Sequence, residues 1–244
     1  MDKLKKLVVE QLEKETDPNE QIRILQEINK KLLTEYAIKV GDLTIEPLLV
    51  EAYYYCEKKF EDKSVHAAYS DSNAPTYRLA RKRQKDNFGE LYVHYGCKDG
   101  IDVVLSNGEY YLSILIKNAL VNGEFKKQCA ISEAICGNCD KCNECDKGLQ
   151  CKYYGEKVLE EKNSNIEGKD IVFLARKGIK GDLADKKLAA LPIGEIRKHP
   201  FTPGESATTL ITNYINEQLK SGCAEEAKLK ELAKGIVAWK HFGA

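Results

Sequence analysis

The chain has 244 residues, and its 43% hydrophobic and 31% charged residues are typical of a folded globular protein and exclude a disordered one. No apolar run is long enough to span a bilayer, and the charged first residues lack the apolar core of a signal peptide, so we expect a cytoplasmic protein without a membrane partner. The 38 basic and 38 acidic residues cancel, which counts against a protein that binds DNA mainly through phosphates.

The first 40 residues predict helices that pack on the core of the protein. A helix is expected to begin at Asp17, an N-cap residue followed by Pro18 in the first turn and by Glu20, whose side chain would reach back to the cap. Apolar side chains then recur at helical spacing, at Ile22, Leu25, Ile28 and Leu32. We therefore expect residues 1–40 to form helices that pack on a single domain formed by residues 41–244.

Strands are predicted in the middle of the chain and helices at its end. Residues 43–55 are apolar and aromatic, which suits a strand. Shorter strands are expected at 91–95, 101–105, 110–117 and 170–176. The dipeptide Asn107-Gly108 is a strong hairpin signal between two of them. The tail returns to helical spacing over 206–219 and 225–239, so the whole chain predicts a mixture of helices and strands.

A carboxylate lies inside the apolar strand that is expected at 43–55. Burying Glu51 there costs free energy unless the side chain has a partner or a chemical task. Aromatic and imidazole side chains follow it in the chain. Each of them also has a structural interpretation, because tyrosines in strands usually pack with the hydroxyl at the rim and a single histidine is more often structural than catalytic. These side chains belong to Tyr53, Tyr54, Tyr55, His66, Tyr92, His94 and Tyr95.

Short motifs follow one another between Leu48 and Gly123, and one more lies near residue 176. In chain order they are Val50-Glu51-Ala52-Tyr53, Ser64-Val65-His66-Ala67, the basic run from Arg78 to Lys85, Phe88-Gly89, Leu91-Tyr92-Val93-His94-Tyr95-Gly96, Ile101-Asp102-Val103-Val104, Ile114-Leu115-Ile116-Lys117-Asn118-Ala119-Leu120 and Ala175-Arg176-Lys177-Gly178-Ile179. This series resembles the 3-methyladenine, or alkyladenine, DNA glycosylase family. In that family the hairpin motif reads Leu-Tyr-Val-Tyr…Tyr-Gly, and the strand that follows it carries Asn.

The resemblance implies a fold and a function. The fold would be of the α+β (mixed) class, a single domain with a curved antiparallel, partly barrel-like sheet flanked by helices. The function would be base-excision repair, in which a damaged base is flipped out of double-stranded DNA and its N-glycosidic bond is hydrolysed. The substrates would be alkylated or deaminated purines. Such an enzyme would act as a monomer in the cytoplasm and associate with the nucleoid when it binds DNA.

The resemblance also assigns roles by position. Glu51 would deprotonate the attacking water and stabilise the cationic sugar, and Asp102 would hold that water. Aromatic side chains would enclose the flipped base, a ring at the hairpin tip would fill the vacated place in the duplex, and cations would contact phosphates. The base-binding residues would be Tyr53, His66, Tyr92 and His94, and the DNA-binding residues would be Tyr95, Arg81, Arg83 and Lys117.

Departures from the family's pattern leave other functions open. Asp102 stands where the family usually has Asn, the loop from Tyr53 to His66 is longer, and the hairpin around His94 is shorter. One alternative is a protein with the glycosylase fold that binds nucleic acid without catalysis. Another alternative is an iron–sulfur or zinc protein of different function.

Six of the nine cysteines lie close together, in an insertion at about residues 129–151. Such clustering in a chain without a secretory signal indicates a metal site rather than a disulfide framework. The spacing fits either a [4Fe–4S] cluster or zinc. We expect this metal to be structural and the glycosylase chemistry to need no cofactor. The candidate ligands are Cys129, Cys136, Cys139, Cys142, Cys145 and Cys151.

Overall fold

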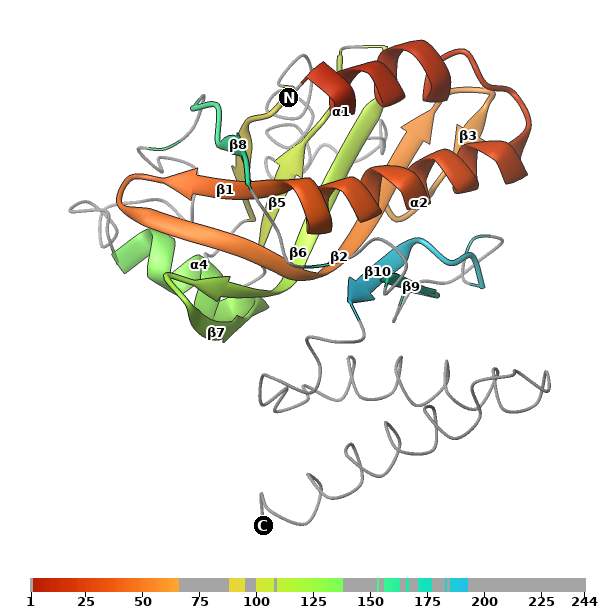
Figure 1. Cartoon of the computed structure of the whole chain (residues 1–244). Coiled ribbons are helices and arrows are strands. Elements are labelled where there is room, and N and C mark those ends of the chain that lie inside the picture. The colour runs from red at the N-terminus through yellow and green to blue at the C-terminus, as the bar shows by residue number, and fades with distance from the viewer. Residues whose placement is uncertain are drawn as a thin grey trace, which may run out of the picture.

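The computed structural model describes residues 2–65, 88–94, 100–107, 109–137, 153, 156–162, 166, 171–176, 183 and 185–192. These residues form a mixed α/β fold whose antiparallel sheet curls into a half-barrel, with helices along it (Figure 1). The predicted mixed fold and curved sheet are thus confirmed, whereas most of the Cys-rich insertion lies outside the described residues. Within the described ranges, no helix combines the length and apolar composition needed to cross a membrane.

Helices occupy the start of the chain and one later segment. They are α1 (Asp2–Lys6), the π-helix η1 (Leu7–Leu12), α2 (Pro18–Glu35) and α4 (Gln128–Gly137). The strands are β1 (Tyr36–Val40), β2 (Leu43–Cys56), β3 (Phe60–Glu61), β4 (Leu91–Val93), β5 (Ile101–Val104), β6 (Tyr111–Val121), β7 (Glu124–Lys127), β8 (Leu159–Glu161), β9 (Ile171–Leu174) and β10 (Ala189–Pro192).

The long strands β2 and β6 form the centre of a ten-stranded sheet among the described residues. The hydrogen-bonded order is β4-β5-β6-β2-β1-β8, with β10 and β3 also pairing with β2, β7 with β6, and β9 with β10. The register between β2 and β6 shifts between Pro47 and Val50. Such a bulge accommodates a proline, which has no N–H to donate to the neighbouring strand, and it bends β2 directly before Glu51.

One face of the sheet is buried against the N-terminal helices. On β2 the alternate residues Val50, Ala52 and Tyr54 belong to the same apolar cluster as Leu25 and Ile28 of α2. Because successive side chains of a strand point to opposite faces, Glu51 and Tyr53 must point to the other face. The core therefore orients the candidate active-site residues away from the helices.

The predicted start of α2 is correct, but one detail of its cap is wrong. The Asp17 side chain accepts a hydrogen bond from the Asn19 N–H at 3.0 Å, as an N-cap residue does. The Glu20 carboxylate does not reach back to the cap, because it binds the Arg23 guanidinium three residues later, at 2.6 Å. The Asp17 N–H instead donates to Oε1 of Glu15 at 2.9 Å.

The predicted strands are present with shifted ends. The strand expected at 43–55 is β2, and the one expected at 110–117 continues to Val121 as β6. The helices expected within residues 1–40 end at Glu35, because Tyr36–Val40 forms β1 of the same sheet. β5 and β6 do form an antiparallel pair. The backbone N–H of Leu105 donates a hydrogen bond to the Leu112 carbonyl, so the connection between the two strands is longer than a two-residue turn. The helices expected at 206–219 and 225–239 lie outside the described residues.

Two buried tyrosines should make the fold sensitive to alkali. Tyr54 and Tyr110 meet edge to face with ring centroids 5.8 Å apart, and burial raises the pKa of both hydroxyls. Tyrosine in an unfolded chain has a pKa of about 10, so the stabilising contribution is full below that pH and is lost as the pH rises through the folded-state values. We expect the free energy of unfolding to fall above pH ~10. As the pH rises, the ultraviolet absorbance that reports tyrosine ionisation and the circular dichroism that reports the fold should therefore change together. Ionisation of every tyrosine near pH ~10 with the fold intact would contradict this.

Candidate active site

Strand pairing places a row of residues on the face of the sheet opposite the helices. Glu51 of β2 lies opposite Leu115 of β6, Leu115 lies opposite Asp102 of β5, and Asp102 lies opposite Tyr92 of β4. Directly opposed residues of antiparallel strands have side chains on the same face. Glu51, Asp102 and Tyr92, which come from three separate motifs, therefore share one surface of the curled sheet.

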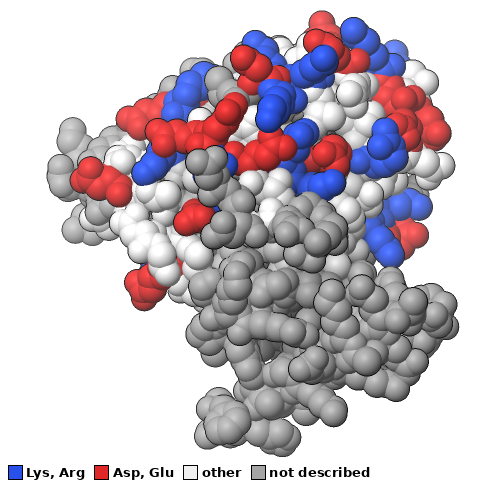
Figure 2. Space-filling view, in the orientation of Figure 1, with Lys and Arg blue, Asp and Glu red and all other residues white. Residues whose placement is uncertain are grey.

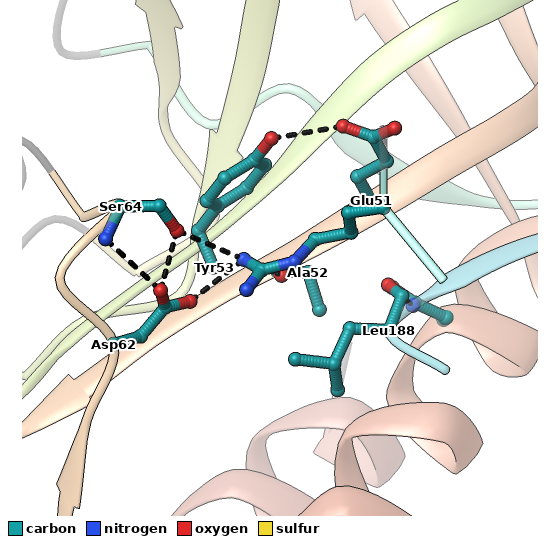
Figure 3. A network of polar contacts seen from close by, with 8 residues as sticks. Glu51, Ala52, Tyr53, Asp62, Ser64 and Leu188 are labelled. Atoms are coloured by element: carbon teal, nitrogen blue, oxygen red, sulfur yellow. Dashed lines mark hydrogen bonds and ion pairs between the residues drawn. The ribbon is translucent and has the colours of Figure 1, made fainter. Parts of the chain in front are cut away.

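Glu51 is a buried carboxylate with one oxygen bound and one left over. Its relative exposure is 0%, and its Oε2 accepts a hydrogen bond from the Tyr53 hydroxyl at 2.8 Å (Figure 3). Its Oε1 has no hydrogen-bond partner within the described part of the chain. A buried acceptor without a partner costs about 1–3 kcal/mol. Among the described residues, Oε1 is therefore able to accept a further hydrogen bond.

Lys117 lies directly beside Glu51, whereas a residue that contacts DNA phosphates would lie at a distance from it. Its Nζ is 3.8 Å from Oε2 of Glu51, and its side chain is only 19% exposed. The ammonium group is thus the ion-pair partner of the buried carboxylate. The structure thus brings this predicted DNA-binding residue into the immediate surroundings of the predicted catalytic residue.

Tyr53 is held at both its hydroxyl and its ring. The hydroxyl donates to Glu51, and the guanidinium of Arg176 lies 4.6 Å from the ring centroid. Burial, and then the neighbouring charge of Glu51, raise the pKa of Tyr53 far above its ordinary value, so the hydroxyl stays protonated and remains a donor. Because Arg176 covers one face of the ring, a base stacked on Tyr53 would have to use the other face.

Arg176 belongs to a buried polar network that the sequence did not reveal. Its Nη1 donates to Oδ2 of Asp62 at 2.6 Å, to the Ala52 carbonyl at 3.1 Å and to the Ser64 hydroxyl at 3.2 Å. Asp62 in turn accepts from the Ser64 hydroxyl and N–H (Figure 3). The only sequence signal was an arginine directly after an apolar strand, in the motif at residues 175–179.

His94 and Asp102 form a second polar pair on the same face. His94 Nε2 lies 2.8 Å from Oδ1 of Asp102, and the Asp102 side chain is 3% exposed. The Tyr92 ring meets the imidazole edge to face, with centroids 5.1 Å apart. Asp102 is thus bound to an imidazole, an interaction that the water-holding role expected from its sequence position did not include.

Several predicted site residues lie outside the described residues, so the structure does not place them. They are His66 of the base-binding set, Tyr95, Arg81 and Arg83 of the DNA-binding set, and Cys139, Cys142, Cys145 and Cys151 of the metal set.

In the part that is described, Figure 2 shows basic and acidic side chains intermixed over α1 and α2. Ion pairs such as Lys31–Glu35, at 2.8 Å, account for this mixture, so the helical face is a poor phosphate-binding surface.

Two candidate metal ligands are described, and both lie on α4. Cys129 is exposed near the start of the helix and Cys136 is buried near its end. Seven residues of helix separate their backbones by about 10 Å. Two sulfurs on one zinc lie at most ~4.6 Å apart, since each Zn–S bond is about 2.3 Å. With α4 intact, Cys129 and Cys136 therefore do not hold the same zinc ion, and Cys136 is the better candidate because Cys139 follows it closely in the chain.

Metal analysis can test this assignment. We expect protein purified without oxygen to contain either an iron–sulfur cluster or about one equivalent of zinc. Cys139→Ser should lose the metal and much of the thermal stability, and if the metal is zinc, Cys129→Ser should keep both. Elemental analysis, visible absorbance and thermal unfolding are the measurements. Metal-free wild-type protein of full stability would show that the thiols need no ion.

No protein-family model matches the chain, and a search of curated proteins also gives no match. The arrangement of side chains around Glu51 is therefore the observation from which function is inferred.

Proposed function

We propose that this protein is a base-excision DNA glycosylase that hydrolyses the N-glycosidic bond of alkylated or deaminated purines in double-stranded DNA. The observation that carries the proposal is the Glu51 carboxylate, which is buried, anchored through Oε2 and unpartnered at Oε1 among the described residues. The order of motifs that resembles the alkyladenine DNA glycosylases is the second support. Structural metal at the cysteines belongs to the same proposal, with no cofactor for the reaction itself.

The contacts of Glu51 suit a group that activates water. The Tyr53 hydroxyl and the Lys117 ammonium both approach Oε2, which leaves Oε1 as the oxygen that can accept a proton from water, as a general base does. A water molecule at Oε1 would lose its proton to Glu51 as it attacks the anomeric carbon. The cationic character that the sugar gains as the base departs is stabilised by the same carboxylate, as in other glycosidic cleavages.

A second carboxylate, that of Asp102, lies on the same face of the sheet as Glu51. Glu51 and Asp102 are on strands separated only by β6, which puts their backbones about 10 Å apart. Enzymes that cleave glycosidic bonds by direct attack of water place their two carboxyl groups about 6.5–9.5 Å apart, which leaves room for the water and the sugar. The backbone spacing of Glu51 and Asp102 is close to this range, and Leu115 lies between them on the same face of the sheet.

Release of free base from defined DNA duplexes tests the proposal. Duplexes with one 7-methylguanine or one hypoxanthine are incubated with the full-length protein, and the free base and abasic sites are both quantified. We expect base release with strand breaks only after alkali, since the chemistry uses water and not an amine nucleophile. An undamaged duplex is the control. Tight binding of the damaged duplex with no release from either substrate would replace this proposal with the non-catalytic alternative.

A further inference from the structure

Arg176 uses only one of its three guanidinium nitrogens in the buried polar network. Nη1 donates to the Asp62 carboxylate, the Ala52 carbonyl and the Ser64 hydroxyl. Nε and Nη2 are buried as well, and neither has a hydrogen-bond partner among the described residues. A buried donor without a partner costs free energy, and an acceptor that binds there recovers it. The two nitrogens are therefore open positions for the acceptor atoms of a ligand.

The two unpartnered nitrogens lie on the same edge of the guanidinium. The five N–H donors of arginine have fixed directions in one plane, and the Nε–H and one N–H of Nη2 point the same way. Such an edge binds two acceptor atoms of one planar group at once. Nη1, which makes the contacts of the network, is not part of this edge. The free edge of Arg176 is thus a preformed fork for a ligand with two adjacent acceptors.

The charges around this fork favour a neutral ligand. The positive charge of Arg176 is compensated by the Asp62 carboxylate, 2.6 Å away. Glu51, which binds the ring hydroxyl of Tyr53 on the same side chain that Arg176 covers, is paired with Lys117. These described residues leave no positive charge uncompensated, and a buried anion without a counter-charge is costly. A carbonyl oxygen beside a ring nitrogen has no net charge and offers acceptors to both donors.

Purine bases with an oxygen at position 6 present such a pair of acceptors, O6 and N7. A bidentate contact from arginine to these two atoms is the commonest base-specific contact in protein–DNA complexes. Hypoxanthine, which forms by deamination of adenine, has both acceptors, whereas adenine has an amino donor in place of O6. A base that is flipped out of the duplex enters the protein, where the unpartnered donors of Arg176 are buried.

We propose that Arg176 is a specificity-determining residue whose Nε and Nη2 bind O6 and N7 of a flipped 6-oxopurine such as hypoxanthine. This inference rests on the proposed glycosylase function and names the substrate class within it. A base at this edge lies beside the guanidinium in the same plane, so Arg176 keeps its place over the Tyr53 ring. Adenine is rejected, because its amino group would face the fork with a donor and leave both groups unpaired.

Binding of DNA without turnover tests the proposal. The full-length Glu51→Gln variant is titrated with duplexes that contain hypoxanthine, 7-deazahypoxanthine, purine or adenine. Each base lies opposite an abasic analogue, so that differences in base pairing do not contribute. The deaza analogue lacks the N7 acceptor, purine lacks O6, and adenine has a donor at that position. We expect the hypoxanthine duplex to bind more tightly than each of the others, by about 5- to 150-fold against adenine, as one good bidentate contact provides.

Arg176→Lys tests the role of the fork itself. Lysine keeps a positive charge beside Asp62 but has no planar pair of donors, so the preference for hypoxanthine should disappear. Ser64→Ala is the matched control, because it removes an acceptor of Nη1 and leaves Nε and Nη2 unchanged. Its preference for hypoxanthine should persist. Circular dichroism reports whether each variant is folded, and the comparison of the four duplexes needs no change at Arg176.

The outcomes separate the two proposals. Equal binding of the hypoxanthine, deaza and purine duplexes would overturn the role of Arg176 and show that its free edge holds at most water. An equal loss of affinity for all four duplexes in folded Arg176→Lys, or an unchanged preference, would also overturn it. Base release by the wild type is scored separately. Release with equal binding leaves the glycosylase proposal standing, whereas selective binding without release keeps the role of Arg176 and replaces the glycosylase with the non-catalytic alternative.

Discussion

Glu51→Gln is expected to lower the single-turnover rate of base release by about two to four orders of magnitude, because the amide keeps the shape of the side chain but takes no proton from water. Binding to damaged duplex should persist, since the contacts that hold DNA do not depend on this proton. Base release and duplex binding are measured on the same preparation. Wild-type activity in the Glu51→Gln variant would remove the carboxylate from the mechanism.

Glu46→Gln is the matched control for this variant. Glu46 lies on the same strand, and its side chain is 42% exposed and pairs with Lys162 at 3.4 Å. The same chemical change there alters a partly exposed ion pair, which contributes little to stability. We expect its rate of base release to stay within about twofold of wild type, as is usual for surface substitutions. A comparable loss in both variants would show that β2 is sensitive to charge in general.

Arg176→Met is expected to destabilise the protein by about 3–5 kcal/mol, because it leaves the carboxylate of Asp62 buried without its partner. The Arg176 side chain is 0% exposed and lies 2.6 Å from Asp62, so solvent does not replace the lost interaction. The free energy of unfolding in urea is the measurement. The exposed pair Arg23–Glu20 has the same 2.6 Å separation, and Arg23→Met should therefore change stability far less.

A double variant separates the charge from the packing. Replacing Asp62 by Asn in the Arg176→Met background removes the uncompensated charge, so part of the lost stability should return. The surviving variants should also release base more slowly, because the guanidinium no longer supports the Tyr53 ring that orients Glu51. If Arg176→Met unfolded in urea as the wild type does, the buried ion pair would contribute nothing to the fold.

Local patterns were enough to locate α2, the long strands β2 and β6 and the candidate carboxylate. The cap at Asp17, the apolar run of β2 and the strand signal of β6 each depend on neighbouring residues, and the structure has an element at each place. Glu51 was conspicuous for a similarly local reason, since a carboxylate inside an apolar strand violates the pattern of its own segment. The sequence by itself thus determined where to look for chemistry.

Only the tertiary structure decided which side chains meet. Arg176 contacts Asp62, which is 114 positions earlier in the chain, and no periodicity or spacing connects two such residues. Lys117 was expected at phosphates and lies beside Glu51, because the register of β6 against β2 determines its neighbour. His94 meets Asp102 through the pairing of β4 with β5, and a shift of one residue would have turned one of them to the other face. Strand register is a property of the whole sheet, and for that reason the partners of the site residues could not be determined from the sequence.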